Sequence, residues 1–324
     1  VKRIIRSMIQ EKIKDFINAP IDSINLGDIN SLDLKNEVRL YWGDEPIGIL
    51  NKGENIFSPT VEVLNSEFFE ADQKQIIGNK LQEWIDKKTK TVLKPLKDDI
   101  QPDILSSDLR SITFNLFNSL GTIPVNNFLD DIRKLTDKKK SIISKLGIRI
   151  GVKFIFMPNL MKKNAIELNS LLWRIYNTNN LSGCFPLPNN GRVSFASELS
   201  MPDDYWQAIG YLCINNFAVR VDVFERIFFF ARKKIKSGPF LECSELMNPI
   251  GCNSNQLADL LEFCGISNVI IGNERRLFFY KNNRLKKYSM KKKAKPIKIQ
   301  SQKIKLKERN VDPNSPFAVL QKLL

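Results

Sequence analysis

Apolar positions in the first hundred residues recur mainly with the period of amphipathic helices. Residues 2–18 carry Ile, Met and Phe at helical spacing, and Pro20 follows the predicted end. A longer periodic segment runs from 67 to 97, where Pro95 is expected to close or kink the helix. The pattern then predicts shorter helices, so this part of the chain is expected to be mostly helical.

Two segments have the pattern of β-hairpins. In "NEVRLYWGDEPIGILNKG", residues 36–53, two short apolar strands flank the turn "GDEP". In "YLCINNFAVRVD", residues 211–222, the turn falls at "NN". We expect antiparallel pairing in both.

The stretch "GIRIGVKFIFMPNLMK", residues 147–162, contains two glycines, Gly147 and Gly151, and has two interpretations. Gly147 is expected to cap a helix, a strand is predicted over 148–157, and Pro158 is expected to start the next helix. It lacks the Lys-Ser/Thr of a phosphate loop and the spacing of a dinucleotide fingerprint. The alternative to a purely structural role is a basic edge that contacts a nucleic-acid backbone, formed by Arg149, Lys153, Lys162 and Lys163.

The region 191–282 combines a short helix, a hairpin and a strongly apolar helix over 221–235. Two further helices, 243–248 and 254–264, precede a hairpin that turns at "GNER". Helix-turn-helix followed by a hairpin is the outline of a winged-helix module.

Taken together, these patterns predict an α+β fold that is predominantly α-helical. It would be a helical bundle or platform with small β-hairpins, a winged-helix-like module and a disordered basic C-terminal tail. The predicted segments are 1–64 (a helix and hairpin junction), 65–180 (a helical platform with the strand 148–157), 191–282 (the winged-helix-like module) and 283–324 (the tail).

The net charge of +15 is concentrated at the end of the chain. Residues 281–324 hold 14 Lys/Arg and 2 acids, which leaves 36 Lys/Arg and 33 acids, a net +3, for the rest. A basic segment without a core-forming period is expected to be disordered and to bind phosphates. Its candidate cations are Lys286, Lys287, Lys291, Lys292 and Lys293.

Helix 221–235 adds the candidate cations Arg226, Arg232, Lys233 and Lys234 beside a run of aromatic residues. The run Phe228 to Phe230 could stack on bases. Because three consecutive residues of a helix cannot all face solvent, a core role is the expected one.

The composition excludes several kinds of chemistry. The chain has no histidine, so Ser-His-Asp and Cys-His catalysis are ruled out. Its five cysteines form no C-x-x-C pair, which argues against zinc and favours reduced thiols in a cytoplasmic compartment. Acid pairs such as Asp98/Asp99 and Asp203/Asp204 are interpreted as helix caps or solvated charges. No apolar run approaches the roughly 18 residues that span a bilayer. We therefore expect neither a catalytic site nor a cofactor in this chain.

Several blocks resemble, in order, a known family. "GIRIGVKFIFMPNLMK" followed by "LLW" is similar to the pattern G-x-R-x-G-x-x-x-x-F-x-P-x-L-x-K of bacterial relatives of the mitochondrial degradosome RNA helicase. "YWQAIGYLCINNFAVRVDVFERI", "MNPIGCNSNQLADLLEFCGI" and the terminal "DPNSPFAVLQKLL" resemble later blocks. These relatives are DExH-type, superfamily-two, ATP-dependent helicases.

The resemblance implies the C-terminal accessory region of such a helicase. The motor domains, which would bind ATP and magnesium, would lie before Val1 or on a separate polypeptide, and a first residue other than Met agrees with a longer protein. The implied function is to bind and guide single-stranded or partly duplex RNA or DNA without hydrolysing ATP. The alternative is a free-standing winged-helix protein whose helix 254–264 reads duplex DNA through Asn255 and Gln256, although that helix has no Arg or Lys.

Overall fold

The computed structural model describes residues 2–27, 37–64, 69–97, 107–177, 185–189, 191–271 and 275–280. The chain divides into two units, 1–282 and 283–324, and every described residue belongs to the first. Several predictions lie outside the described residues: the tail cations Lys286, Lys287, Lys291, Lys292 and Lys293, and the acid pair Asp98/Asp99.

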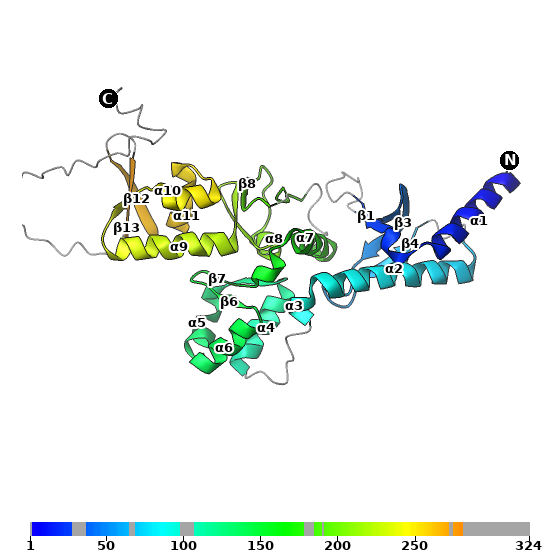
Figure 1. Ribbon diagram of the computed structural model, residues 1–324, viewed down its shortest axis with the longest axis horizontal. Helices are drawn as coiled ribbons and strands as arrows, with labels where there is room; N and C mark the ends of the chain where they lie inside the picture. Colours follow the sequence, from blue (N-terminus) through cyan, green and yellow to red (C-terminus); the bar gives the residue numbers. More distant parts are fainter. Residues whose placement is uncertain are drawn as a thin grey trace, which may run out of the picture. The chain divides into compact units, whose positions relative to one another are not determined.

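In the N-terminal part, the long helices α1 and α2 and the short helix α3 accompany a four-stranded antiparallel sheet (Figure 1). The strand order is β1-β2-β3-β4, and the predicted hairpin at 36–53 is confirmed by the pairing of β2 with β3. The elements are α1 (Lys2–Asn18), a 3-10 helix η1 (Ile21–Ser23), β1 (Ile24–Leu26), β2 (Val38–Trp42), β3 (Glu45–Asn51), β4 (Thr60–Val63), α2 (Ala71–Val92) and α3 (Lys94–Lys97).

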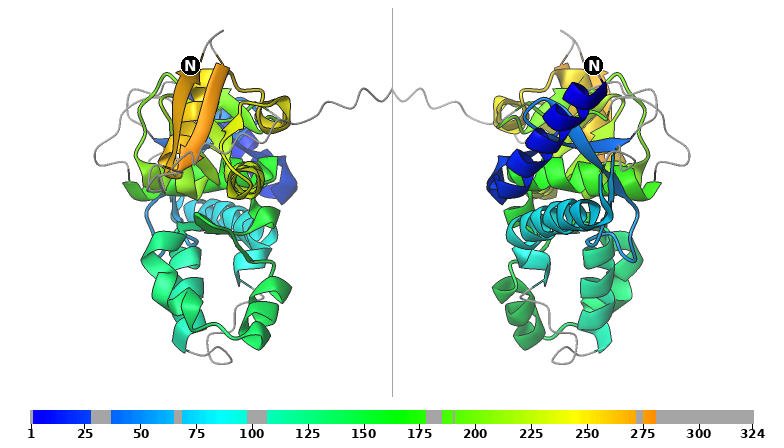
Figure 2. Two further views of the ribbon diagram at one scale, coloured as in Figure 1. Left: turned by 90° about the vertical axis from the view of Figure 1, so that its left-hand side faces the viewer. Right: turned by 90° about the vertical axis from the view of Figure 1, so that its right-hand side faces the viewer.

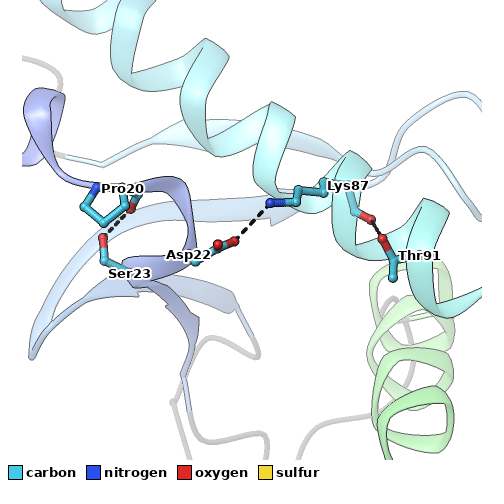
Figure 3. Close-up of polar contacts among 5 residues, drawn as sticks. All are labelled: Pro20, Asp22, Ser23, Lys87 and Thr91. Atoms are coloured by element: carbon cyan, nitrogen blue, oxygen red, sulfur yellow. Dashed lines mark hydrogen bonds and ion pairs between the residues drawn. The ribbon is translucent and has the colours of Figure 1, made fainter.

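Lysines of α2 hold the end of α1 in place. Lys80 Nζ donates hydrogen bonds to the carbonyl oxygens of Phe16 (2.6 Å) and Ile17 (2.9 Å), near the last turn of α1. A cation at this end complements the helix dipole. About two turns further along α2, Lys87 Nζ lies 3.1 Å from a carboxylate oxygen of Asp22 in η1 (Figure 3).

The middle part of the chain packs helices around a small sheet of order β5-β7-β6. In this sheet β7 is central and pairs antiparallel with both neighbours. The elements are α4 (Ser107–Asn118), β5 (Thr122–Pro124), η4 (Val125–Phe128), α5 (Leu129–Arg133), α6 (Asp137–Lys145), β6 (Arg149–Ile150), β7 (Phe154–Phe156), η5 (Pro158–Leu160) and α7 (Lys163–Asn177).

The C-terminal part contains two three-stranded sheets, β8-β10-β9 and β11-β13-β12. The predicted hairpin at 211–222 is confirmed, with Asn215 and Asn216 in left-handed conformation at its turn. Figure 2 shows the paired strands β12 and β13 in orange. The elements are β8 (Ser194–Ala196), α8 (Asp203–Ala208), β9 (Tyr211–Ile214), β10 (Phe217–Arg220), α9 (Val221–Lys236), β11 (Phe240–Leu241), α10 (Ser244–Met247), η7 (Asn248–Ile250), α11 (Ser254–Phe263), β12 (Ile266–Ile271) and β13 (Arg275–Tyr280).

Two hydrophobic cores meet at β7. The side chains of a strand alternate between its two faces. Ile155 is buried in the first core, which includes α2, α4 and α7, whereas Phe154 and Phe156 belong to the second core with α9 and α11. This three-residue strand is therefore buried on both faces and joins the two cores.

The predicted fold class is wrong. The described residues form eleven α-helices interleaved with four small antiparallel sheets, which is a mixed α+β fold and not a predominantly helical bundle or platform. Many of the strands have only two to four residues, too few for the alternation that identifies a strand in a sequence.

Two more specific predictions also need correction. The single strand expected over 148–157 is a hairpin of β6 and β7, with a turn between Ile150 and Phe154. The winged-helix-like module at 191–282 is not confirmed: this region contains two separate sheets, and the first of the two helices predicted for the module, 243–248, is α10, one turn of four residues.

Candidate nucleic-acid interface

Helix α9 buries one side and presents a stripe of cations and phenylalanines on the other. Val221, Phe224, Ile227, Phe228, Ala231 and Ile235 are buried. Exposed residues recur three or four positions apart, which places them on one side of the helix. We call this set the α9 stripe: Arg226, Phe229, Phe230, Lys233 and Lys236.

The aromatic run of α9 is divided between core and surface. Phe228 is 3% exposed, but Phe229 is 60% exposed and Phe230 is 47% exposed. Successive helical residues point about 100° apart, so the run cannot share one environment. The expectation that the run belongs to the core is thus wrong for two of its three members, and these two rings meet edge-to-face with centroids 6.0 Å apart.

The cations of α9 differ in how far their charge is already offset. Among the described residues, neither Arg226 nor Lys233 forms an ion pair. Lys234 Nζ lies 2.8 Å from a carboxylate oxygen of Glu245. The hydrogen bond between these two groups raises the pKa of Lys234 and lowers the pKa of Glu245. Lys234 is therefore the weakest of the predicted α9 cations as a phosphate ligand.

A second group of cations borders aromatic rings beside α9. Lys153 Nζ lies 5.4 Å from the ring centroid of Phe263, and the Arg232 guanidinium lies 5.9 Å from that of Phe228. Burial raises the pKa of the Cys264 thiol to about 12, against the opposing influence of the Lys153 and Arg232 charges. Both cations thus lie near one thiol, so the structure brings two predicted residues together.

The turn between β6 and β7 binds a carboxylate of the protein itself. The N–H of Val152 donates to Glu225 Oε2 at 2.7 Å, and the N–H groups of Lys153 and Phe154 both donate to Oε1 at 2.7 Å. A Cβ on Gly151 would lie 2.4 Å from the Glu225 carboxyl carbon, so only glycine permits this approach. We call this arrangement the Glu225 nest.

The Glu225 nest gives the glycine stretch a structural role, while the alternative role of its cationic side chains stays a prediction. Consecutive backbone N–H groups in a turn form an anion-binding concavity. Here the anion is the buried side chain of α9, so these N–H groups are not available to a nucleic-acid phosphate. The stretch joins the two cores, and Arg149 is an exposed residue of β6.

Lys162 and Lys163 lie elsewhere, at the edge of a cavity of about 310 Å³. They share this cavity with Arg192 and Arg220, which the sequence analysis did not single out. We call it the basic cavity, after these four cations. No local pattern pointed to Arg192 or Arg220, because the loop before β8 and the end of β10 reach α7 only in the fold.

The side chains proposed to read bases in α11 are engaged within the protein. Gln256 accepts a hydrogen bond from the Asn253 N–H in the helix-capping box, and Asn255 accepts one from Arg276. These contacts weigh against duplex reading by Asn255 and Gln256.

No group of three or more His, Cys, Asp or Glu side chains in the described ranges is arranged to hold a metal ion. No helix there combines the length and apolar character required to cross a lipid bilayer.

Comparisons of the whole chain with protein-family models, with curated proteins and with solved structures gave no match. The similarity to the helicase blocks therefore remains an expectation from the sequence.

Proposed function

We propose that the chain binds single-stranded nucleic acid through the α9 stripe. The observation that carries this proposal is the exposure of Phe229 and Phe230 between Arg226 and Lys233 on one side of a helix. Proteins that bind single strands without sequence preference combine aromatic rings, on which bases stack, with cations that follow the phosphate backbone. The α9 stripe has both.

The exposure of two neighbouring phenylalanine rings, Phe229 and Phe230, supports a binding role. Single apolar residues at a surface are ordinary, but a neighbouring pair of large rings flanked by charge is typical of an interaction site. Stacking one base on an aromatic side chain contributes about 1–3 kcal/mol. Lys153 and Arg232, beside the rings of Phe263 and Phe228, would extend the same surface.

The helicase context of the proposal comes from the sequence resemblance. In this proposal the chain is the strand-guiding C-terminal region of a bacterial, cytoplasmic, ATP-dependent RNA or DNA helicase. ATP and magnesium would bind to motor domains on the same or another polypeptide, and this chain would hydrolyse nothing itself. The tail cations from Lys286 to Lys293 would add sequence-independent attraction to phosphates.

Fluorescence anisotropy with labelled 20-nucleotide single strands tests the proposal on the full chain. The variant F229A/F230A is expected to bind at least about tenfold more weakly, since stacking of a single base accounts for that much. The matched control is Phe114→Ala, because Phe114 is 65% exposed on α4. Equal affinity of F229A/F230A, Phe114→Ala and the unchanged chain would contradict a role for the stripe.

Salt dependence gives a second readout in the same assay. The logarithm of the binding constant falls with the logarithm of salt by about 0.7 for each phosphate that is neutralised on a single strand. R226Q/K233Q should make this negative slope shallower by about 1.4, because two phosphate contacts are lost. Engagement of six tail cations alone would give a slope near −4. A response to salt that is flat in the unchanged chain would exclude the electrostatic mechanism.

A further inference from the structure

The basic cavity gathers cations from three separate segments of the chain. Lys162 directly precedes α7 and Lys163 begins it, Arg192 comes from the loop before β8, and Arg220 from the end of β10. Ligand pockets in proteins have volumes of roughly 300–1,000 Å³. At about 310 Å³ the basic cavity has room for one small ligand.

The charges around the cavity leave a clear surplus. Glu167 lies 3.9 Å from Lys163, and Asp222 pairs with Arg220, so four cations face two carboxylates and a charge of +2 remains. A phosphate monoester carries about −1.5 to −2 at pH 7. A phosphodiester inside a strand carries a single negative charge, so the cavity matches a terminal phosphate better than an internal one.

Two of the cationic segments are held in position by hydrogen bonds. Asp222 accepts bonds from Arg220 Nε (2.6 Å) and Nη2 (3.0 Å), which fixes the guanidinium plane and leaves three of its five N–H donors for a ligand. The buried Tyr211 hydroxyl donates to the Arg192 carbonyl oxygen at 2.8 Å. This bond ties the Arg192 segment to β9.

Part of the lining of the cavity is apolar. Met161, Ile166, Leu187 and Pro188 contribute to its lining. Met161 and Ile166 are buried and Leu187 and Pro188 are half-buried, so an inorganic phosphate ion would engage the cations but would leave Leu187 and Pro188 partly uncovered. A ligand that carries a flat or apolar group next to its phosphate would cover them as well.

We propose that the basic cavity binds a nucleoside monophosphate unit, in which a phosphate monoester engages the four cations and the nucleoside lies on the apolar part of the lining. Two sources share this chemistry: a free mononucleotide and the 5′-phosphorylated end of a strand. The second source rests on the proposed function, and the first does not.

Calorimetric titration of the full chain tests the cavity with adenosine monophosphate, adenosine and inorganic phosphate as separate probes. Adenosine monophosphate should bind at least about tenfold more tightly than either fragment, because it alone makes both sets of contacts. K162Q/R192Q should weaken its binding by about tenfold for each lost cation. K134Q/K145Q, which removes two exposed lysines elsewhere, should bind it unchanged.

A competition assay distinguishes the two sources. Ten-nucleotide strands with a 5′-phosphate or a 5′-hydroxyl compete with adenosine monophosphate for the cavity. If the phosphorylated strand competes better, and K162Q/R192Q removes this advantage, the strand end is the ligand. Equal competition by the two strands, with tight binding of adenosine monophosphate, supports the free nucleotide. F229A/F230A should keep its affinity for adenosine monophosphate, so a failure of strand binding at the α9 stripe can be told apart from a failure of ligand binding in the basic cavity. Adenosine monophosphate that binds no more tightly than phosphate, or binds K162Q/R192Q normally, overturns the proposal.

Discussion

The Glu225 nest and the basic cavity both attract negative charge, but they are built from different groups. In the nest, three backbone N–H groups surround one buried carboxylate of the same chain. In the cavity, four side-chain cations outnumber the two carboxylates that contact them. A nest that is satisfied internally acts as a structural joint, whereas surplus side-chain charge around an open volume is typical of a binding site.

The position of the nest links stability to the proposed interface. Glu225 belongs to α9 in the second core, and its partners lie in the turn before β7, the strand shared by both cores. The nest therefore fixes the helix that carries the exposed phenylalanines relative to that sheet. Substitutions in the nest should first reduce stability, and those in the cavity should first reduce binding.

Gly151→Ala is expected to have the largest effect on stability. The added methyl carbon would lie 2.4 Å from the Glu225 carboxyl carbon, so the carboxylate must leave some of its donors. A buried charge without its partners costs about 3–5 kcal/mol. Urea unfolding of the full chain should show a loss of free energy of unfolding of at least about 3 kcal/mol.

Gly78→Ala is the matched control for that substitution. Gly78 lies within α2, and a Cβ there would meet only a Val63 methyl group at 3.6 Å, an ordinary contact. Alanine should stabilise the helix by up to about 1 kcal/mol. A loss of similar size in both variants would show that the nest has no special role.

Glu225→Gln should have a smaller effect, of about 2 kcal/mol. The amide keeps one acceptor oxygen but brings an NH₂ group towards backbone donors, and part of the nest is left unsatisfied.

The labelling rate of Cys264 provides a second readout for Glu225→Gln. Burial raises the pKa of this thiol to about 12 from an ordinary 9.0, so little thiolate exists at pH 8. The Glu225 charge also raises this pKa, so its removal and any loss of burial both lower the pKa towards 9.0, and alkylation, followed by peptide mass spectrometry, becomes faster. An unchanged labelling rate together with an unchanged free energy of unfolding would contradict the role of the Glu225 nest as a structural joint.

Features with a local signal were predictable from the sequence. The helix over residues 2–18 and the hairpins β2–β3 and β9–β10 follow from apolar spacing and from the turn residues. The strand at 148–157 was misread because a hairpin of two- and three-residue strands has almost the same alternation as one longer strand. Helical periodicity could have assigned Phe229 and Phe230 to the exposed side, since Phe224, Ile227, Phe228 and Ala231 already define the buried side.

Features that depend on distant residues left no signal in the sequence. Glu225 is 73 residues from Val152, and an acid at the start of an apolar helix reads as a solvated charge. Arg192 and Arg220 line the same cavity as Lys162 only because the fold brings together segments that are far apart in the sequence. The sequence around Gly151 lacks the pattern of a phosphate loop. It could not reveal that the same glycine serves an internal carboxylate.

K162Q/R192Q is expected to have the smallest effect on stability. Both side chains are exposed and neither lies in a core, so the free energy of unfolding should change by no more than about 0.5 kcal/mol. Removing two like charges from one rim relieves repulsion, which favours a change towards higher stability. Adenosine monophosphate at ten times its dissociation constant should stabilise the unchanged chain by about 1.4 kcal/mol and this variant much less. A loss of 2 kcal/mol or more, without ligand, would mean that these cations hold the fold together as Glu225 does, because a surface charge that only binds ligand contributes nothing to folding in its absence.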